Sequence, residues 1–349
     1  MLMVGIIGQP RAGKTTIYNA VAAAHADPDA YQGRDELRRT MVKVPDPRLD
    51  QLEELFAPPK KVNAEIEYFD FPPLTGDAGE VASLPPALRE LNALIMVLRG
   101  FGENPDPVAD ARAVDEELVL ADLMVVEKRM PRLKKEIDSG RNVCRPEYEA
   151  LVKCRVLLDE GRSLRDLELT DTEERLLRGY GLLSRMPLLA LINAPDEGSD
   201  LSEEEWAARL DLGARSLVRV LRGQLEAELA LLDPDDRAVF MTDYDLTTSA
   251  LDGMIAACYS ALGLITFFTG RSEVEVRAWT VRRGARAPEA AGVIHSDFQQ
   301  GFIRAEVTSI ADLVAAGSPA AARKAGKSRL EGKEYVVNDG DFILFRFNV

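Results

Sequence analysis

Short apolar runs separated by amphipathic segments make up residues 1–105 and 186–264. The continuous apolar runs Met3–Ile7, Ala93–Arg99 and Met186–Asn193 are typical of buried parallel strands. Residues 62–71 alternate apolar and polar side chains, which predicts a further strand, and helical patterns lie between these runs. Strands that alternate with helices predict an α/β domain with a mostly parallel sheet.

Residues 106–185 are charged and helical, and they interrupt this pattern. Apolar residues recur there at spacings of four and three: Val119, Leu123, Val126, Met130, Leu133 and Ile137. A second helix from Glu147 to about Gly161 carries a similar seam after a break near Gly140. The seam predicts a coiled-coil helical hairpin inserted into the α/β domain. Whether the hairpin is a packed insertion or an interaction arm stays open.

Residues 265–349 change character, with short strands around one helical segment, which predicts a small α+β domain. This part is locally basic, and the basic residues there include Arg271, Arg277, Arg282, Arg283, Arg286, Arg304, Arg323, Lys324, Lys327, Arg329 and Lys333. Together with Trp279, Phe298 and Phe302, they are compatible either with RNA contact or with an ordinary solvated surface.

The composition narrows the class of protein. The net charge of −15 argues against indiscriminate nucleic-acid binding, although a local basic patch is compatible with RNA. No apolar run reaches the roughly 18 residues of a transmembrane helix, and no signal peptide is recognisable. The three cysteines match no metal or redox spacing. We expect a cytoplasmic protein without a membrane partner.

The most specific motif is Gly8-Gln9-Pro10-Arg11-Ala12-Gly13-Lys14-Thr15, between an apolar strand and a helix. This is the phosphate-binding loop pattern in its required context. Glycines let backbone N–H groups point inward at phosphate oxygens, and the helix N-terminus adds partial positive charge. We expect Lys14 to reach the phosphates and the Thr15 hydroxyl to bind Mg²⁺. The predicted nucleotide contacts here are Gly8, Arg11, Ala12, Gly13, Lys14, Thr15 and Thr16.

Asp70 ends the predicted strand 62–71, where a P-loop protein holds Mg²⁺ through water. GTPases continue this residue as Asp-x-x-Gly, and the glycine N–H contacts the γ-phosphate. Here the fourth position is Pro73, which has no N–H. Thr40 is the candidate for a first-switch threonine, although it reads more readily as a strand residue.

Asn193-Ala194-Pro195-Asp196 follows the strand 186–193, where GTPases carry Asn-Lys-x-Asp. There the aspartate reads guanine and the lysine stem packs on the base; here the lysine is absent. We expect Asn193 to brace the phosphate loop and meet the base, with Asp196 nearby.

These features add up to a resemblance. The chain resembles the YchF (Obg-like ATPase) family of P-loop proteins over nearly its whole length, as a divergent member. The matching segments are Gly8–Thr15, Val44–Leu49, Asp106–Asp110, Glu127–Arg129, Leu167–Thr170, Glu226–Glu228, Glu275–Val281, Ala291–Phe298, Gly301–Val307 and Asp339–Asp341.

The resemblance implies three parts. They are a P-loop nucleotide-binding domain (1–105 and 186–264), a coiled-coil insertion (106–185) and a C-terminal β-grasp domain of the TGS type (265–349). It also implies ATP preferred over GTP, Mg²⁺, slow hydrolysis and association with ribosomes. Asn193 matches the family's Asn-x-x-Glu motif, and Asp196 stands where the family has Glu.

Three segments depart from the family pattern. Pro73 replaces the switch glycine, Gln32-Gly33-Arg34 stands where the family has Phe-x-Thr, and Leu221-Arg222-Gly223 replaces an alanine-rich motif near the base. Loss of one donor to the transferred group costs roughly 3–4 kcal/mol of barrier. Three hypotheses follow: an ATP-binding protein with slow or no hydrolysis, a non-hydrolysing scaffold, and a true GTPase in which Asp196 reads guanine.

Overall fold

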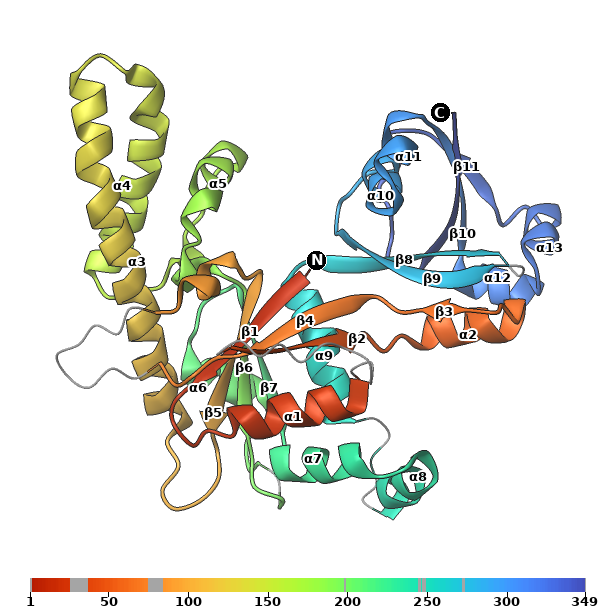
Figure 1. Cartoon of the computed structure of the whole chain (residues 1–349), viewed down its shortest axis with the longest axis horizontal. Coiled ribbons are helices and arrows are strands. Elements are labelled where there is room, and N and C mark those ends of the chain that lie inside the picture. Colours follow the sequence, from red (N-terminus) through yellow and green to blue (C-terminus); the bar gives the residue numbers. More distant parts are fainter. Residues whose placement is uncertain are drawn as a thin grey trace. The chain divides into compact units, whose positions relative to one another are not determined.

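The computed structural model describes residues 2–25, 37–74, 84–197, 199–243, 246, 249–271 and 274–348. Its internal contacts divide the chain into two compact units (Figure 1). The first joins Met1–Val42 with Ile66–Ala261, and the second joins Lys43–Glu65 with Leu262–Val349. Within the described ranges, no helix combines the length and apolar character that a membrane span requires.

The first unit is built on a six-stranded sheet in the order β2-β4-β1-β5-β6-β7. The strands are β1 Leu2–Gly8, β2 Arg38–Lys43, β4 Glu65–Asp70, β5 Ala93–Arg99, β6 Leu188–Asn193 and β7 Ser216–Leu221. Every pairing from β4 to β7 is parallel. Strands β5 and β6 are buried almost throughout, which explains their continuous apolar runs. The predicted α/β class is therefore confirmed.

Helices connect and cover these strands. The α-helices of the nucleotide-binding part are α1 Lys14–His25, α6 Glu203–Leu210, α7 Gly223–Leu231, α8 Pro234–Asp243 and α9 Ala250–Ala261. The short 3₁₀ segments are η1 Pro86–Glu90, η2 Asn142–Cys144, η3 Leu164–Asp166, η4 Arg178–Tyr180 and η5 Leu183–Arg185. Ile17 of α1 and Ile255 of α9 are fully buried, so each helix packs an apolar face into the unit.

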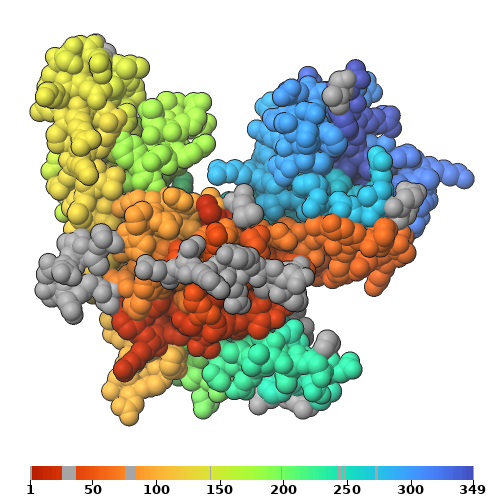
Figure 2. All heavy atoms as spheres, in the orientation of Figure 1, coloured from red at the N-terminus to blue at the C-terminus, as the bar shows by residue number. Residues whose placement is uncertain are grey.

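The insertion contains α3 Pro107–Asp138, α4 Arg145–Asp159 and α5 Asp171–Leu177. Helices α3 and α4 pack side by side and project beyond the sheet (yellow in Figure 2). Val126 and Leu133 of α3 share a buried cluster with Leu151 and Cys154 of α4, as the spacing predicts. The two-helix insertion is thus present, while its coiled-coil geometry stays a prediction.

The second unit holds another six-stranded sheet, in the order β11-β10-β12-β8-β9-β3. Its strands are β3 Lys61–Val62, β8 Leu264–Arg271, β9 Glu275–Arg282, β10 Phe302–Ser309, β11 Arg329–Glu331 and β12 Asp341–Phe347. Its helices are α2 Pro47–Phe56, α10 Ala287–Ile294, α11 Ser296–Gln300, α12 Ile310–Ala316 and α13 Pro319–Lys324. The predicted α+β character of the C-terminal part is confirmed, and its TGS type stays a prediction.

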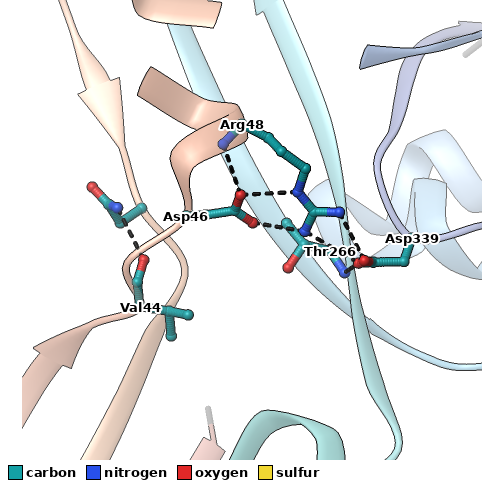
Figure 3. Close-up of polar contacts among 6 residues, drawn as sticks. Val44, Asp46, Arg48, Thr266 and Asp339 are labelled. Carbon is teal, nitrogen blue, oxygen red and sulfur yellow. Dashed lines mark hydrogen bonds and ion pairs between the residues drawn. The ribbon is translucent and has the colours of Figure 1, made fainter. Parts of the chain in front are cut away.

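Segment 43–65, which we expected in the nucleotide-binding domain, packs instead with the C-terminal residues. The contacts of Arg48 contribute to this packing (Figure 3). Its guanidinium donates to both carboxylate oxygens of Asp46, at 2.9 and 2.8 Å, and to Asp339, at 2.7 and 3.3 Å. Asp339 also accepts the Thr266 N–H at 2.8 Å. The partners of Arg48 lie some 290 residues apart in sequence, so local patterning gives no sign of this pairing.

Candidate nucleotide-binding site

The phosphate loop connects the carboxyl end of β1 to the first turn of α1. Its backbone adopts positive φ at Gly8 (146°), Arg11 (61°) and Gly13 (94°). A Cβ atom at Gly8 would lie 2.4 Å from the Val97 carbonyl oxygen, and one at Gly13 would lie 2.2 Å from Asn193 Nδ2. Glycine is therefore required at both positions for space as well as for conformation.

Lys14 lies across this loop and is only 6% exposed. Its Nζ donates to the carbonyl oxygens of Gly8 at 3.0 Å and Gln9 at 2.8 Å. Burial lowers the pKa of Lys14, and the nearby Asp70 carboxylate partly opposes that shift. The ammonium is thus held at the inner surface of the loop by acceptors that a phosphate group can replace.

Thr15 and Asp70 meet beside the lysine. The Thr15 hydroxyl donates to Asp70 Oδ2 at 3.1 Å. Burial raises the pKa of Asp70, while the Thr15 hydrogen bond, Arg38 and Lys14 act in the opposite direction. A hydroxyl and a carboxylate are hard oxygen donors, and they fit Mg²⁺. Among the described residues, no group of three or more His, Cys, Asp or Glu side chains forms a metal cage. A magnesium ion here would complete its shell with phosphate oxygens and water.

Asn193 joins the loop to two further elements. It is 5% exposed at the end of β6. Its Nδ2 donates to the Ala12 carbonyl oxygen at 3.0 Å, and its Oδ1 accepts the Gly223 N–H at 2.9 Å. One side chain therefore connects the phosphate loop, β6 and the start of α7, and it fixes the back of the loop.

The remaining predicted residues are placed less centrally. Arg11 is exposed, and Thr16 is half-buried in the first turn of α1. Asp196 is exposed, and its backbone oxygen accepts from Arg222 Nη1 at 3.3 Å. Thr40 is buried within β2. The first-switch stretch Gln32-Gly33-Arg34 lies outside the described residues.

Comparison with known proteins supports the same assignment of family. The family model described as YchF-GTPase_C, "Protein of unknown function (DUF933)", matches residues 264–348. The chain is 38% identical to the "Ribosome-binding ATPase YchF" of Bacillus subtilis (strain 168), over 100% of both chains. The chain belongs to the YchF (Obg-like ATPase) family.

Two eukaryotic members of the YchF family are also similar to this chain. The chain is 34% identical to "Obg-like ATPase 1" of Gallus gallus, over 99% of this chain and 92% of that protein. The solved structure of the Schizosaccharomyces pombe YchF GTPase superposes with a TM-score of 0.84 at 27% identity, covering 99% of this chain and 97% of that one. The predicted membership in the YchF family is confirmed.

Several segments that resemble YchF motifs build the fold and not the site. Asp106 caps α3 by accepting the Ala109 N–H at 3.0 Å. Thr170 and Glu173 form a reciprocal capping box at the start of α5. The buried Glu226 accepts from the Ser249 hydroxyl at 2.7 Å and the Ala250 N–H at 2.9 Å, at the start of α9. These polar residues stabilise helix starts.

Two residues near the loop were missed by sequence reasoning. A ring carbon of Phe101 lies 3.9 Å from the position that a Gly13 Cβ would take. Arg38 Nη1 lies 3.8 Å from Asp70 Oδ2. Neither residue belongs to a spacing motif. The available signal was positional, because Phe101 follows the buried strand β5 and Arg38 is the first residue of β2, the neighbour of β4.

Proposed function

We propose that this chain binds a nucleoside triphosphate with Mg²⁺ at the loop 8–16, and that ATP is preferred over GTP. The observation that supports the proposal is the arrangement of four polar side chains around the loop. Lys14 is buried at the inner surface of the loop, Thr15 and Asp70 lie at its end, and Asn193 fixes its back.

The chain's own residues would divide the work as follows. Backbone N–H groups of Gly13 to Thr16 would donate to the phosphates, and the α1 N-terminus would add its dipole. Lys14 would neutralise the β- and γ-phosphates, and Thr15 and Asp70 would hold Mg²⁺ directly and through water. When bound, Mg²⁺ supplies further neutralisation of phosphate charge.

The proposal includes slow or absent hydrolysis. Pro73, three residues after Asp70, has no N–H to offer the terminal phosphate. One missing donor of this kind raises the barrier by about 3–4 kcal/mol, or roughly a hundred- to a thousand-fold in rate. This observation also favours the second candidate, a protein that binds nucleotide without turnover and serves as a scaffold.

The preference for ATP is tested by displacement of a fluorescent ATP analogue from the wild-type protein. Ala194 stands where GTPases place the lysine that packs on guanine, so we expect ATP to displace the analogue at least tenfold more effectively than GTP. Asp196→Ala is expected to leave this order unchanged. A tenfold advantage for GTP that disappears in Asp196→Ala would establish the GTPase alternative.

We further propose association with a ribosome or another RNA–protein assembly. Relatives of this chain are named ribosome-binding ATPases. In the second unit, Arg282, Arg283 and Arg304 are exposed, as basic RNA contacts require. Other basic residues there are engaged by acids, including Arg286 with Glu334 and Lys327 with Asp312 at 3.1 Å. The charge available to phosphates is therefore smaller than the sequence count indicates.

Charge reversal tests this surface in the full chain. The triple variant Arg282→Glu, Arg283→Glu, Arg304→Glu is expected to weaken ribosome co-sedimentation and to reduce the slope of log affinity against log salt by about two to three. The matched control is Lys134→Glu, Lys135→Glu, Arg141→Glu, which makes the same charge change at exposed positions of the hairpin. A larger effect of the control would place the contact on the hairpin, and no effect of either would refute both surfaces.

A further inference from the structure

Arg38 opens β2 and reaches α1 and the end of β4. Its Nη2 donates to Asn19 Oδ1 at 2.7 Å, and its guanidinium carbon lies 4.9 Å from the centre of the Tyr18 ring. Its Nη1 lies 3.8 Å from Asp70 Oδ2. Tyr18 and Asn19 belong to α1, the helix that begins with Lys14 and Thr15. Three separate contacts therefore hold the side chain between α1 and the end of β4, beside Asp70, although it remains 53% exposed.

The order of the sheet defines which end of a nucleotide meets Arg38. Asp70 ends β4, on one side of β1, whereas Asn193 ends β6, two strands away on the other side. A nucleotide that uses both residues lies across the carboxyl ends of these strands, with its metal-binding phosphates toward β4 and its base toward β6 and β7. Strand β2 is the neighbour of β4, so Arg38 lies at the terminal-phosphate end.

The charges around Asp70 support the same placement. The carboxylate faces the Thr15 hydroxyl, the Arg38 guanidinium and the charge of Lys14. The separation of 3.8 Å between Arg38 and Asp70 exceeds a hydrogen-bond distance, so this ion pair is loose. A phosphate is a stronger partner, because a guanidinium matches two of its oxygens at once.

We propose that Arg38 contacts the terminal phosphate of the bound triphosphate and lets this chain distinguish a triphosphate from a diphosphate. The contact takes over part of the role that Pro73, without an N–H, is unable to perform. Asn19 and Tyr18 hold the guanidinium in reach of that phosphate. This inference rests on the proposed nucleotide binding and assigns a residue that recognises the terminal phosphate at that site.

Arg39 provides a matched control on the same strand. Its Nη1 lies 3.6 Å from Glu67 Oε1 of β4, so it also pairs with an acid of the neighbouring strand. Successive strand residues point to opposite faces, which directs Arg39 away from the side of Arg38. Arg39→Ala therefore removes one positive charge and one ion pair to β4 without removing the proposed phosphate contact.

The test measures ATP and ADP affinities by calorimetry with Mg²⁺ for wild type, Arg38→Ala, Arg38→Lys and Arg39→Ala. We expect Arg38→Ala to weaken ATP binding about ten- to a hundred-fold, as loss of a charge-assisted hydrogen bond does, and ADP binding less than about twofold. The ATP affinity of Arg38→Lys should lie between those of wild type and Arg38→Ala, because lysine keeps the charge and loses the bidentate geometry. Arg39→Ala should keep the wild-type ratio of the two affinities.

The outcomes separate the inference from the function on which it rests. If Arg38→Ala weakens the ATP and ADP affinities by the same factor, Arg38 has a structural role and the inference is overturned. Unchanged affinities for both nucleotides would overturn it as well. Thermal melting of each variant shows whether the fold is retained, and Arg38→Lys carries the test if the alanine variant fails to fold. No binding of either nucleotide by wild type would refute the proposed function and the inference together.

Discussion

Replacing Lys14 with alanine is expected to abolish tight triphosphate binding while leaving the protein folded. Among the described residues, the Lys14 ammonium is the one cation that donates hydrogen bonds inside the loop, to the carbonyl oxygens of Gly8 and Gln9. Its loss removes charge-assisted contacts to two phosphates, each worth roughly 1.5–3 kcal/mol. Affinity should therefore fall by at least about a hundred-fold.

In contrast to its loss of affinity, Lys14→Ala should be as stable as wild type or more stable. Burial lowers the pKa of Lys14, so the folded state disfavours the charged form relative to the unfolded chain. A lysine whose folded pKa is depressed costs stability at neutral pH, and that cost declines as pH rises from the folded pKa to the higher pKa of the unfolded chain. Lys14→Ala should thus melt at or above the wild-type temperature without nucleotide.

Titration with a fluorescent ATP analogue checks the loss of affinity, and a thermal melt of the same protein without nucleotide checks the effect on stability. The control is Lys60→Ala, an exposed lysine outside the loop, which should bind like wild type. Retained affinity in Lys14→Ala would remove the lysine from the site. Lost affinity together with a lowered melting temperature would mean that the lysine acts through folding.

The second large effect concerns Asp122, which is 0% exposed on α3. Its Oδ1 accepts the Leu183 N–H at 2.9 Å and Arg89 Nη1 at 3.0 Å, and its Oδ2 accepts the Ser184 N–H and hydroxyl, both at 2.8 Å. Burial raises the pKa of Asp122, and these four donors act against that shift. The carboxylate thereby fastens the first half of the insertion to the segment before β6.

Asp122→Ala should destabilise the protein by about 3–5 kcal/mol, because it removes the ion pair with Arg89 and leaves the Leu183 and Ser184 N–H groups buried without their acceptor. In a thermal melt this corresponds to a loss of roughly 10 °C. Asp122→Asn keeps the side-chain volume and one acceptor oxygen, so its loss of stability should be smaller than that of Asp122→Ala. The exposed Asp138→Ala, on the same helix, should change stability by no more than about 0.5 kcal/mol. Equal melting of Asp122→Ala and Asp138→Ala would contradict the role of this network.

The parts of the site that the sequence predicts are the local ones. Gly8, Gly13 and Lys14 follow from spacing, since a loop between a strand and a helix needs glycine conformations and a cation at fixed positions. The start of α2 at Pro47 is likewise local, because Asp46 caps the helix through the Arg48 N–H at 3.0 Å.

The missed features depend on partners far away in the sequence. Asp122 has the sequence pattern of an ordinary helix-surface aspartate, and its role depends on Ser184, 62 residues away. Arg48 pairs segment 43–65 with Asp339, 291 residues away. Arg38 lies next to Asp70 because β2 and β4 are neighbours in the sheet. Hydrophobic periodicity records which face is buried, and it carries no information about which polar group will meet which.

We propose that the loop 8–16 binds a nucleoside triphosphate, whatever the rate of hydrolysis. Isothermal titration of the wild-type full chain with ATP and Mg²⁺ tests it most directly. We expect saturable binding at one site per chain, with ATP bound more tightly than ADP. The absence of binding heat with ATP, GTP, ADP and GDP alike, at several temperatures, would contradict it.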